Sequence, residues 1–247
     1  MKKNRWFFWL ILLAVPGCED AAQECAMLEA KSGYVTGGVL TYDFAYQLTN
    51  GGNKVLKLEI RKTETGELSS VVEYTYNSNG DLASEFRKNS NSLYQYHKYY
   101  TYGSKTLTEI EYTILGEDTL KVEESLDLYL ENPVDGIYHL STSSYKIENG
   151  NVVEFGYYSL SGTDTTDTFV ERYEYDSHLN YYTLPEFRNI IPPEFKWAIV
   201  TSRNNLIRAS SIGGGWNKPY DFQYGGTKLL QYVGPAGLTI DFEYQCH

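Results

Sequence analysis

Hydrophobic and polar residues alternate with a period of two along most of the chain, from about Gly38 to Tyr244. Val72, Tyr74 and Tyr76, for example, lie two positions apart. Successive side chains of a β-strand point to opposite faces, so this spacing predicts strands with one apolar face each. The same spacing recurs at Leu56, Leu58 and Ile60, at Leu120, Val122, Leu126, Leu128 and Leu130, at Val153, Phe155 and Tyr157, at Phe169, Tyr173 and Tyr175, and at Leu238, Ile240, Phe242 and Tyr244.

Turn residues separate these predicted strands at intervals of roughly 8–12 residues. Gly51-Gly52, Asn77–Gly80, Glu148–Gly150 and Gly225-Gly226 supply residues that tolerate a positive φ, and each can join two adjacent antiparallel strands. A degenerate repeat runs through them, in which an aromatic-x-aromatic strand end is followed by a turn and an apolar residue. The pattern predicts an all-β fold, an antiparallel up-and-down meander of hairpins that forms a barrel or a strongly curled sheet.

One stretch, residues 177–205, interrupts the alternation. It contains Pro185, Pro192 and Pro193 among aperiodically spaced aromatic residues. Proline cannot donate a hydrogen bond to a neighbouring strand, so the stretch cannot form a central strand. We expect an insertion or cap with a short irregular or helical turn.

The N-terminal residues have the pattern of a bacterial lipoprotein signal peptide. Lys2, Lys3 and Arg5 precede the apolar run 6–15, which is shorter than the roughly 20 residues needed to span a bilayer. The run ends at Cys18 in a sequence, residues 15–18, that resembles the lipobox. We therefore expect residues 1–17 to be a signal peptide, 18–33 a lipidated tether and 34–247 a single β domain. The alternative is ordinary secretion with a free Cys18.

The acidic pair Glu19-Asp20 follows this cysteine directly. It resembles the export signal that places lipoproteins of Bacteroidota on the outer face of the outer membrane. The prediction is a lipid-anchored outer-membrane protein that faces the cell exterior, with the periplasmic face as the alternative.

The amino-acid composition favours a β fold and limits the partners that the protein can bind. The chain has 24 Tyr and 2 Met, which favours strands over helices. Residues 1–17 contain three of its 21 Lys and Arg and none of its 32 Asp and Glu, so the remainder carries a net charge of −14. Nucleic-acid binding needs clustered cations, so no nucleic-acid partner is expected. Contact with the membrane is expected only through acyl chains on Cys18.

Two further cysteines lie near the ends of the predicted domain, Cys25 and Cys246. Disulfides persist in extracytoplasmic compartments, and this pair predicts a covalent link between the two ends. A loop of about 220 residues gives a stabilisation on the order of 4–5 kcal/mol in the chain-entropy model. The alternative is two unpaired residues.

The polar residues do not form a recognisable catalytic or metal-binding motif. The four histidines, His97, His139, His178 and His247, have no metal-ligand spacing, and we expect no catalytic residue, metal or cofactor. Glu109 and Glu111 share a predicted strand face, which leaves a glycoside hydrolase open as a third hypothesis. The polar run Gly162–Thr168 has alternating oxygen ligands suited to Ca²⁺, but a hairpin tip explains it better.

The aromatic residues are the stronger functional lead. Trp216 follows three glycines, and Tyr181, Tyr182 and Trp197 lie in the insertion. Exposed Tyr and Trp rings offer sugars a flat apolar platform with polar edges, so these four are the predicted ligand-binding residues. The alternative is that they are core residues.

Several of these motifs resemble a known family. The segment Tyr173–Asp176, then Asn180, Asn204-Asn205, the hairpin strand 220–224 and the closing 242–244 are similar to the uncharacterised Tyr-rich domain of Bacteroidota lipoproteins. The resemblance implies a porin-like fold and an envelope address, and it implies no activity.

Two functions follow as hypotheses. The first is a non-catalytic surface lipoprotein that binds a glycan or another extracellular molecule through aromatic residues, and it predicts a concave site near Trp197 and Trp216. The second is a structural component of an envelope protein assembly, and it predicts a broad exposed apolar patch.

Overall fold

The structure is a computed structural model that describes residues 25–36, 39–48, 54–161, 164–184, 187 and 194–246; of 25–43, 158–168, 236, 245 and 246 it describes no side chains. The signal peptide, Cys18, the turn Gly51-Gly52 and the prolines of the insertion lie outside these residues, as does part of the Gly162–Thr168 run.

A large antiparallel sheet contains eleven of the described strands, in the order β15-β16-β17-β1-β2-β3-β4-β5-β6-β7-β8. Neighbours from β1 to β8 are consecutive in sequence, so this part is a meander of hairpins, as the alternation predicts. The strands are β1 (Cys25–Thr36), β2 (Val39–Leu48), β3 (Val55–Lys62), β4 (Leu68–Tyr76), β5 (Leu82–Asn89), β6 (Tyr94–Tyr102), β7 (Thr106–Leu115), β8 (Asp118–Leu128), β15 (Asp221–Gly225), β16 (Lys228–Val233) and β17 (Leu238–Cys246).

A second antiparallel sheet contains six strands in the order β14-β13-β12-β11-β10-β9. The chain passes from this sheet to the first through Tyr220, which alone separates β14 from β15. At the other side β8 and β9 are edge strands, so the described strands form two curled sheets rather than a closed barrel. The all-β prediction is confirmed. These strands are β9 (Gly136–Leu140), β10 (Ser143–Glu148), β11 (Asn151–Ser161), β12 (Asp164–Leu179), β13 (Asn204–Ile212) and β14 (Asn217–Pro219).

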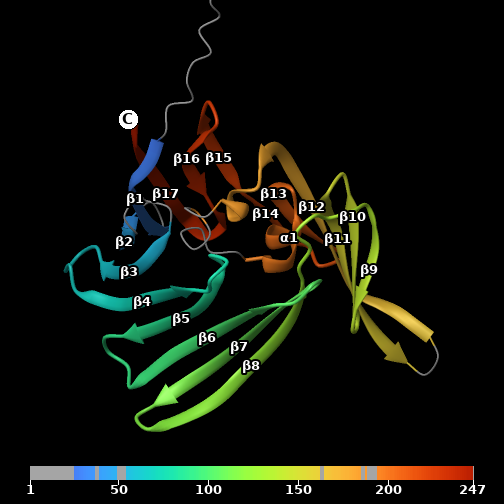
Figure 1. Ribbon diagram of the computed structural model, residues 1–247, viewed down its shortest axis with the longest axis horizontal. Coiled ribbons are helices and arrows are strands. Elements are labelled where there is room, and N and C mark those ends of the chain that lie inside the picture. Colours follow the sequence, from blue (N-terminus) through green and yellow to red (C-terminus); the bar gives the residue numbers. More distant parts are fainter. Residues whose placement is uncertain are drawn as a thin grey trace, which may run out of the picture.

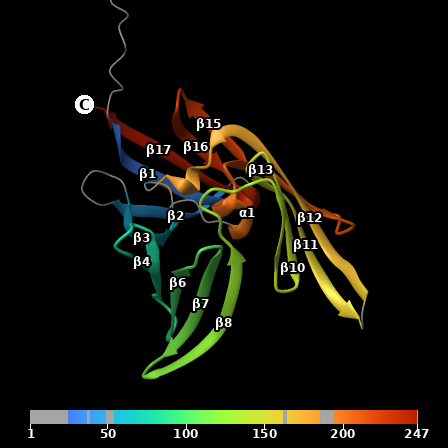
Figure 2. The same cartoon turned by 45° about the vertical axis from the view of Figure 1, so that its right-hand side comes forward.

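The two sheets splay apart as wings from a common region (Figures 1 and 2). Within the described residues, three short helices interrupt the strands: η1 (Tyr181–Thr183), α1 (Lys196–Thr201) and η2 (Pro235–Gly237). The first two lie within the predicted insertion, and α1 packs against β8, β11 and β13 between the wings. We call the sheet faces turned toward α1 the inner faces and the opposite ones the outer faces.

The hairpin turns have the predicted backbone chemistry. Gly80, Asn149, Gly150 and Gly226 have φ angles of 86°, 53°, 77° and 67°. This left-handed region is accessible to Gly and Asn at little cost, which explains those residue types at the turns.

The first and last strands pair with each other. The β1–β17 ladder brings Cys25 directly opposite Cys246. β1 begins at Cys25, inside the segment 18–33 expected as a tether, because pairing with β17 gives this irregular sequence a ladder that its own pattern does not indicate.

The inner faces form a continuous core. Val72, Tyr74, Leu238, Ile240 and Phe242 are buried as their alternation predicts. β8 departs from the prediction, because Leu128 is buried but Leu120, Val122 and Leu126 are exposed. β8 is an edge strand, and its ladder with β7 shifts register at Val122. Leu126 lies opposite Thr108 and Leu120 opposite Thr113, so the shift puts these two leucines on opposite faces of the sheet and the alternation does not bury them together.

Candidate functional site

Aromatic rings from three neighbouring strands lie together on the outer face of the first sheet. The ring centroids of His97 and Tyr99 on β6 are 4.1 Å apart, and Phe86 on β5 lies 5.2 Å from His97. Tyr112 on β7 meets Tyr99 edge-on at 5.8 Å. We call these four residues the outer platform. Cross-strand register explains it, because Phe86, His97 and Tyr112 are directly opposite one another.

The outer platform borders an open groove of about 450 Å³. The platform supplies flat rings, and the polar atoms at their edges include the Tyr99 hydroxyl, which lies 3.0 Å from His97 Nδ1. Tyr99 is 44% exposed, so a ligand can reach its ring. This combination of apolar faces and polar edges suits a sugar ring. The groove is lined by His97, Tyr99, Ile110, Tyr112, Ile114 and Thr119.

The His97 ring is expected to titrate below the ordinary histidine range. Partial burial lowers the pKa of His97 from the usual 6.5, because it removes water from the charged form. The ring is therefore neutral at neutral pH and becomes charged only on acidification. An NMR titration should give a midpoint below 6.5 for His97. Tyr99→Ala should return it toward that value, and a wild-type midpoint at or above 6.5 contradicts the prediction.

A second groove, of about 410 Å³, lies where the two sheets meet. Tyr102 and Tyr129 make an edge-on contact at its wall, with ring centroids 5.3 Å apart. Asp81 and Glu131 supply carboxylates, and Arg203 supplies a cation. We call this the junction groove; its mixed charges favour a polar ligand.

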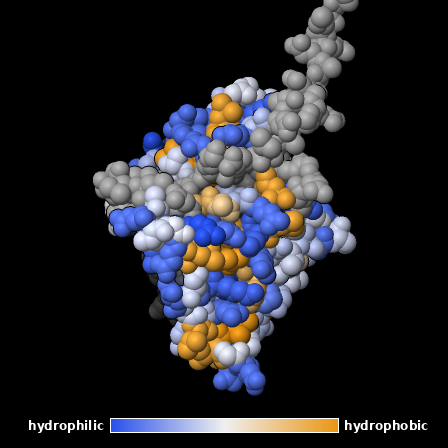
Figure 3. All heavy atoms as spheres, turned by 90° about the vertical axis from the view of Figure 1, so that its left-hand side faces the viewer, coloured by the Kyte–Doolittle hydropathy of each residue, from blue (hydrophilic) through white to orange (hydrophobic). Residues whose placement is uncertain are grey.

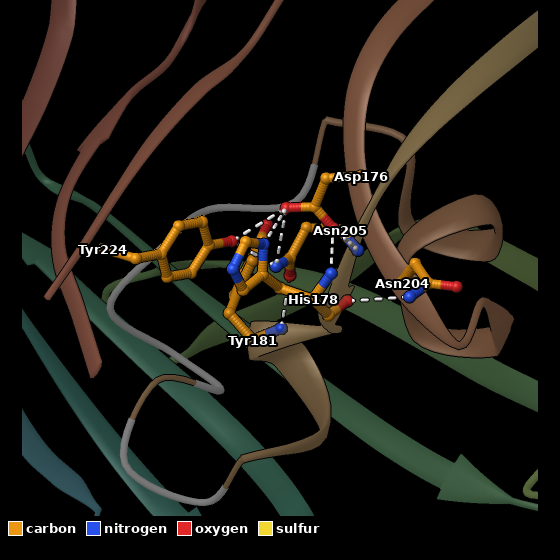
Figure 4. A network of polar contacts seen from close by, with 6 residues as sticks. All are labelled: Asp176, His178, Tyr181, Asn204, Asn205 and Tyr224. Carbon is orange, nitrogen blue, oxygen red and sulfur yellow. Dashed lines mark hydrogen bonds and ion pairs between the residues drawn. The ribbon is translucent and has the colours of Figure 1, made fainter. Parts of the chain in front are cut away.

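Four of the residues that carry the family resemblance, Asp176, Asn204, Asn205 and Tyr224, lie in one polar network with His178 and Tyr181 at this junction (Figure 4). The Asp176 carboxylate accepts hydrogen bonds from the Tyr224 hydroxyl at 2.9 Å and the Asn205 backbone N–H at 3.2 Å. Asn205 Oδ1 in turn accepts from the Tyr181 N–H at 2.6 Å. His178 stacks on Tyr224 with ring centroids 3.7 Å apart. These contacts tie β12, β13 and β15 to η1, so the motif has a structural role.

The four predicted ligand-binding residues fall in two places. Tyr181 and Tyr182 are 3% and 7% exposed and belong to the core. Tyr182 also lines the junction groove. The polar network explains their burial, because it holds the N-terminus of η1 against β13.

Trp197 and Trp216 are half-buried, and both rings contact Phe195. The Trp197 indole N–H donates to the Tyr173 hydroxyl at 3.0 Å. Trp216 stacks on Phe195 with centroids 5.6 Å apart and rings 14° from parallel. Both rings are thus committed to contacts within the protein, and ligand binding by these four residues stays a prediction.

The outer platform is not among the binding residues predicted from the sequence. The signal was the run from Tyr94 to Tyr100, which puts aromatic residues on both faces of one strand. A strand with one face in the core must then expose rings on the other.

The carboxylates Glu109 and Glu111 on the inner face are ion-paired. Lys98 Nζ lies 2.9 Å from Glu109 and 3.0 Å from Glu111, and Lys196 also pairs with Glu109. Burial pushes the pKa of Glu109 up, but Lys196 and Lys98 outweigh it and hold that pKa below its usual value. Glu109 therefore stays ionised and anchors α1 to the sheet.

Within the described residues there is no group of three His, Cys, Asp or Glu able to hold a metal ion. In the same part of the chain, no helix has the length and apolar character to cross a membrane.

Of the comparisons with known proteins, only the one with solved structures gives a match. No family model and no curated protein matches the sequence, so membership of the Tyr-rich family stays a prediction. Among solved structures, the chain is similar to a porin-like protein from Bacteroides vulgatus ATCC 8482, at 10% identity and a TM-score of 0.43. The match covers 90% of this chain and 99% of the other.

Proposed function

We propose that this protein is a non-catalytic outer-membrane lipoprotein, anchored through Cys18 and facing the cell exterior, that binds an extracellular glycan. The signal peptide and lipobox support the address, and Glu19-Asp20 supports the outer face. The outer platform carries the binding proposal, because its rings lie on an exposed sheet face beside a groove of ligand size.

The platform differs from the site expected in the sequence. The rings of His97, Tyr99 and Tyr112 line an open groove, whereas Trp216 is stacked on Phe195. His97 on β6 lies directly opposite Tyr112 on β7, so an extended ligand such as a glycan chain can contact rings from both strands at once.

Glycan binding is expected to depend on Tyr99 and Tyr112. A glycan array followed by isothermal titration should detect binding by the protein from Glu19 onward. Replacing both tyrosines by alanine should weaken it at least about tenfold, because two stacking faces are lost. Trp216→Ala is the matched control and should leave the affinity within about twofold, while circular dichroism checks the fold of each variant.

The other outcomes separate the competing sites and functions. Loss of binding in Trp216→Ala, with the double tyrosine variant unaffected, places the site at Trp216 and rejects the outer platform. Absence of binding to any glycan by well-folded protein rejects glycan recognition. A glycoside hydrolase is the third function, and release of reducing sugar in the same samples would reveal it.

The second function, a component of an envelope assembly, is favoured by one observation. Apolar side chains are exposed at the ends of β6, β7 and β8, and Leu93 is 81% exposed. Figure 3 shows apolar atoms gathered near the lower end of the molecule, at the height of these strand ends in Figure 1. Such patches commonly contact another protein. The group comprises Leu93, Tyr94, Leu115, Leu120 and Val122.

A further inference from the structure

The register of β1 against β17 places the two cysteines of the predicted domain opposite each other. The ladder runs from the pair Cys25 and Cys246 to the pair Tyr34 and Leu238. Ala26 is opposite Gln245 in the next position. The two cysteines thus meet at one end of the ladder that joins the first strand to the last, although the whole domain separates them in sequence.

We infer that Cys25 and Cys246 form a disulfide bond. Directly opposite residues of antiparallel strands have Cα atoms roughly 4.5 or 5.5 Å apart, depending on whether the pair is hydrogen-bonded. Disulfides join Cα atoms about 4.4–6.8 Å apart, so either kind of pair is within reach. Opposite residues also share one face of the sheet, whereas a slip of one residue puts them on opposite faces.

The bond forms by oxidation of the two thiols. Each thiol loses its proton and the pair gives up two electrons, which reduce the disulfide of an oxidant protein to a dithiol by exchange. Such oxidants maintain disulfides in extracytoplasmic compartments. The inference therefore rests on the extracytoplasmic address of the proposed function. The remaining cysteine, Cys18, is the lipid attachment site in that proposal, where a thioether removes its thiol from competition.

The position of the bond gives it a mechanical role. Strand ends fray, and this pair lies at the end of the ladder that is nearest to Cys18 in sequence. Cys25 lies seven positions after Cys18 in the sequence, so the chain between them reaches at most about 25 Å. Any pull on the lipid anchor acts first on this pair, and a covalent bond passes the load to β17 as well as β1.

Peptide mapping without reduction tests the inference. Trypsin cleaves after Lys31 and after Lys228, and no Lys or Arg follows Lys228. A digest of protein from Glu19 onward, oxidised with glutathione disulfide and alkylated, should contain peptide 19–31 linked to peptide 229–247. Reduction should release both. Cys246→Ser should remove the linked species and leave Cys25 alkylated.

Variants that move the cysteines by one position test whether the bond needs the register of the ladder or only chain ends that lie close together. The variant C25S/A26C puts the first cysteine on the opposite sheet face from Cys246, and the linked peptide should be lost. Adding Q245C and C246S moves the second cysteine to the position opposite Ala26, and the link should return. Equal linking in the singly shifted variant would overturn the inference, as would two separate alkylated peptides from the oxidised wild type.

The same peptide mapping on protein isolated from its native cells separates two hypotheses, the pairing of the cysteines and the extracytoplasmic location of the protein. A link after oxidation in vitro but not in cells supports the pairing and rejects the extracytoplasmic address. A link in both supports both. Glycan binding is measured separately, so its failure leaves this result unchanged.

Discussion

Replacing Lys196 by methionine is expected to lower the free energy of unfolding by about 3 kcal/mol, because it removes one partner of a largely buried ion pair. The side chain of Lys196 is 14% exposed and that of its partner Glu109 18%. The Lys196 ammonium also lies 4.1 Å from the Tyr100 ring centroid. The loss leaves Glu109 charged between α1 and the sheet with only Lys98 beside it.

Thermal unfolding measures this effect. A loss of about 3 kcal/mol in a domain of this size should lower the Tm by roughly 6–12 °C. The double variant K196M/E109Q removes the stranded charge and should recover most of the loss. Lys146→Met is the matched control, because its pair with Glu148 is about half exposed and should be worth less than about 1 kcal/mol. Equal losses at Lys146 and Lys196 would contradict the prediction.

Replacing Asn180 by alanine is the second change with a large expected effect, again about 3 kcal/mol of lost stability. Asn180 is 1% exposed. Its Oδ1 accepts from the Tyr182 N–H at 2.9 Å, and its Nδ2 donates to the carbonyls of Ile199 and Ser202. Alanine strands these three backbone groups away from water.

Urea denaturation of the variant gives the free energy directly, and the m value shows whether the native state stays compact. Asn180→Asp should also destabilise the protein, because a carboxylate cannot donate to the two carbonyls. Asn217→Ala changes an exposed amide on β14 and should cost less than about 0.5 kcal/mol. A loss below about 1 kcal/mol for Asn180→Ala would show that water reaches these groups.

The strands and turns could be predicted because their determinants are local. A period of two and a Gly or Asn at each turn specify a hairpin within ten residues, as at Asn149 and Gly150. The exposure of Leu120 could not be predicted in this way. It depends on β8 being an edge and on the bulge beside Val122, which are properties of the whole sheet.

The positions of the candidate binding residues depend even more on residues far away in the sequence. Tyr181 and Tyr182 are aromatic residues in a proline-rich stretch, a pattern typical of an exposed binding loop. Their backbone N–H groups are held by Asn205, at the far end of this stretch on β13, and by Asn180, and these contacts keep the two tyrosines in the core. The outer platform likewise needs the register of three strands, although His97 and Tyr99 already share a face within β6.

The pairing of β1 with β17 also sets the order in which the fold can be assembled. β1 and β17 are about 200 residues apart in sequence, so one edge of β1 stays open until the last strand is available for pairing. The hairpins from β2 to β8 involve neighbours in sequence and can form early, whereas closure at β1 is a contact of the longest range. An open strand edge is a template for pairing with other chains. The nascent protein is therefore most exposed to misassembly at the strand that emerges first, and a holding chaperone has the most to protect there.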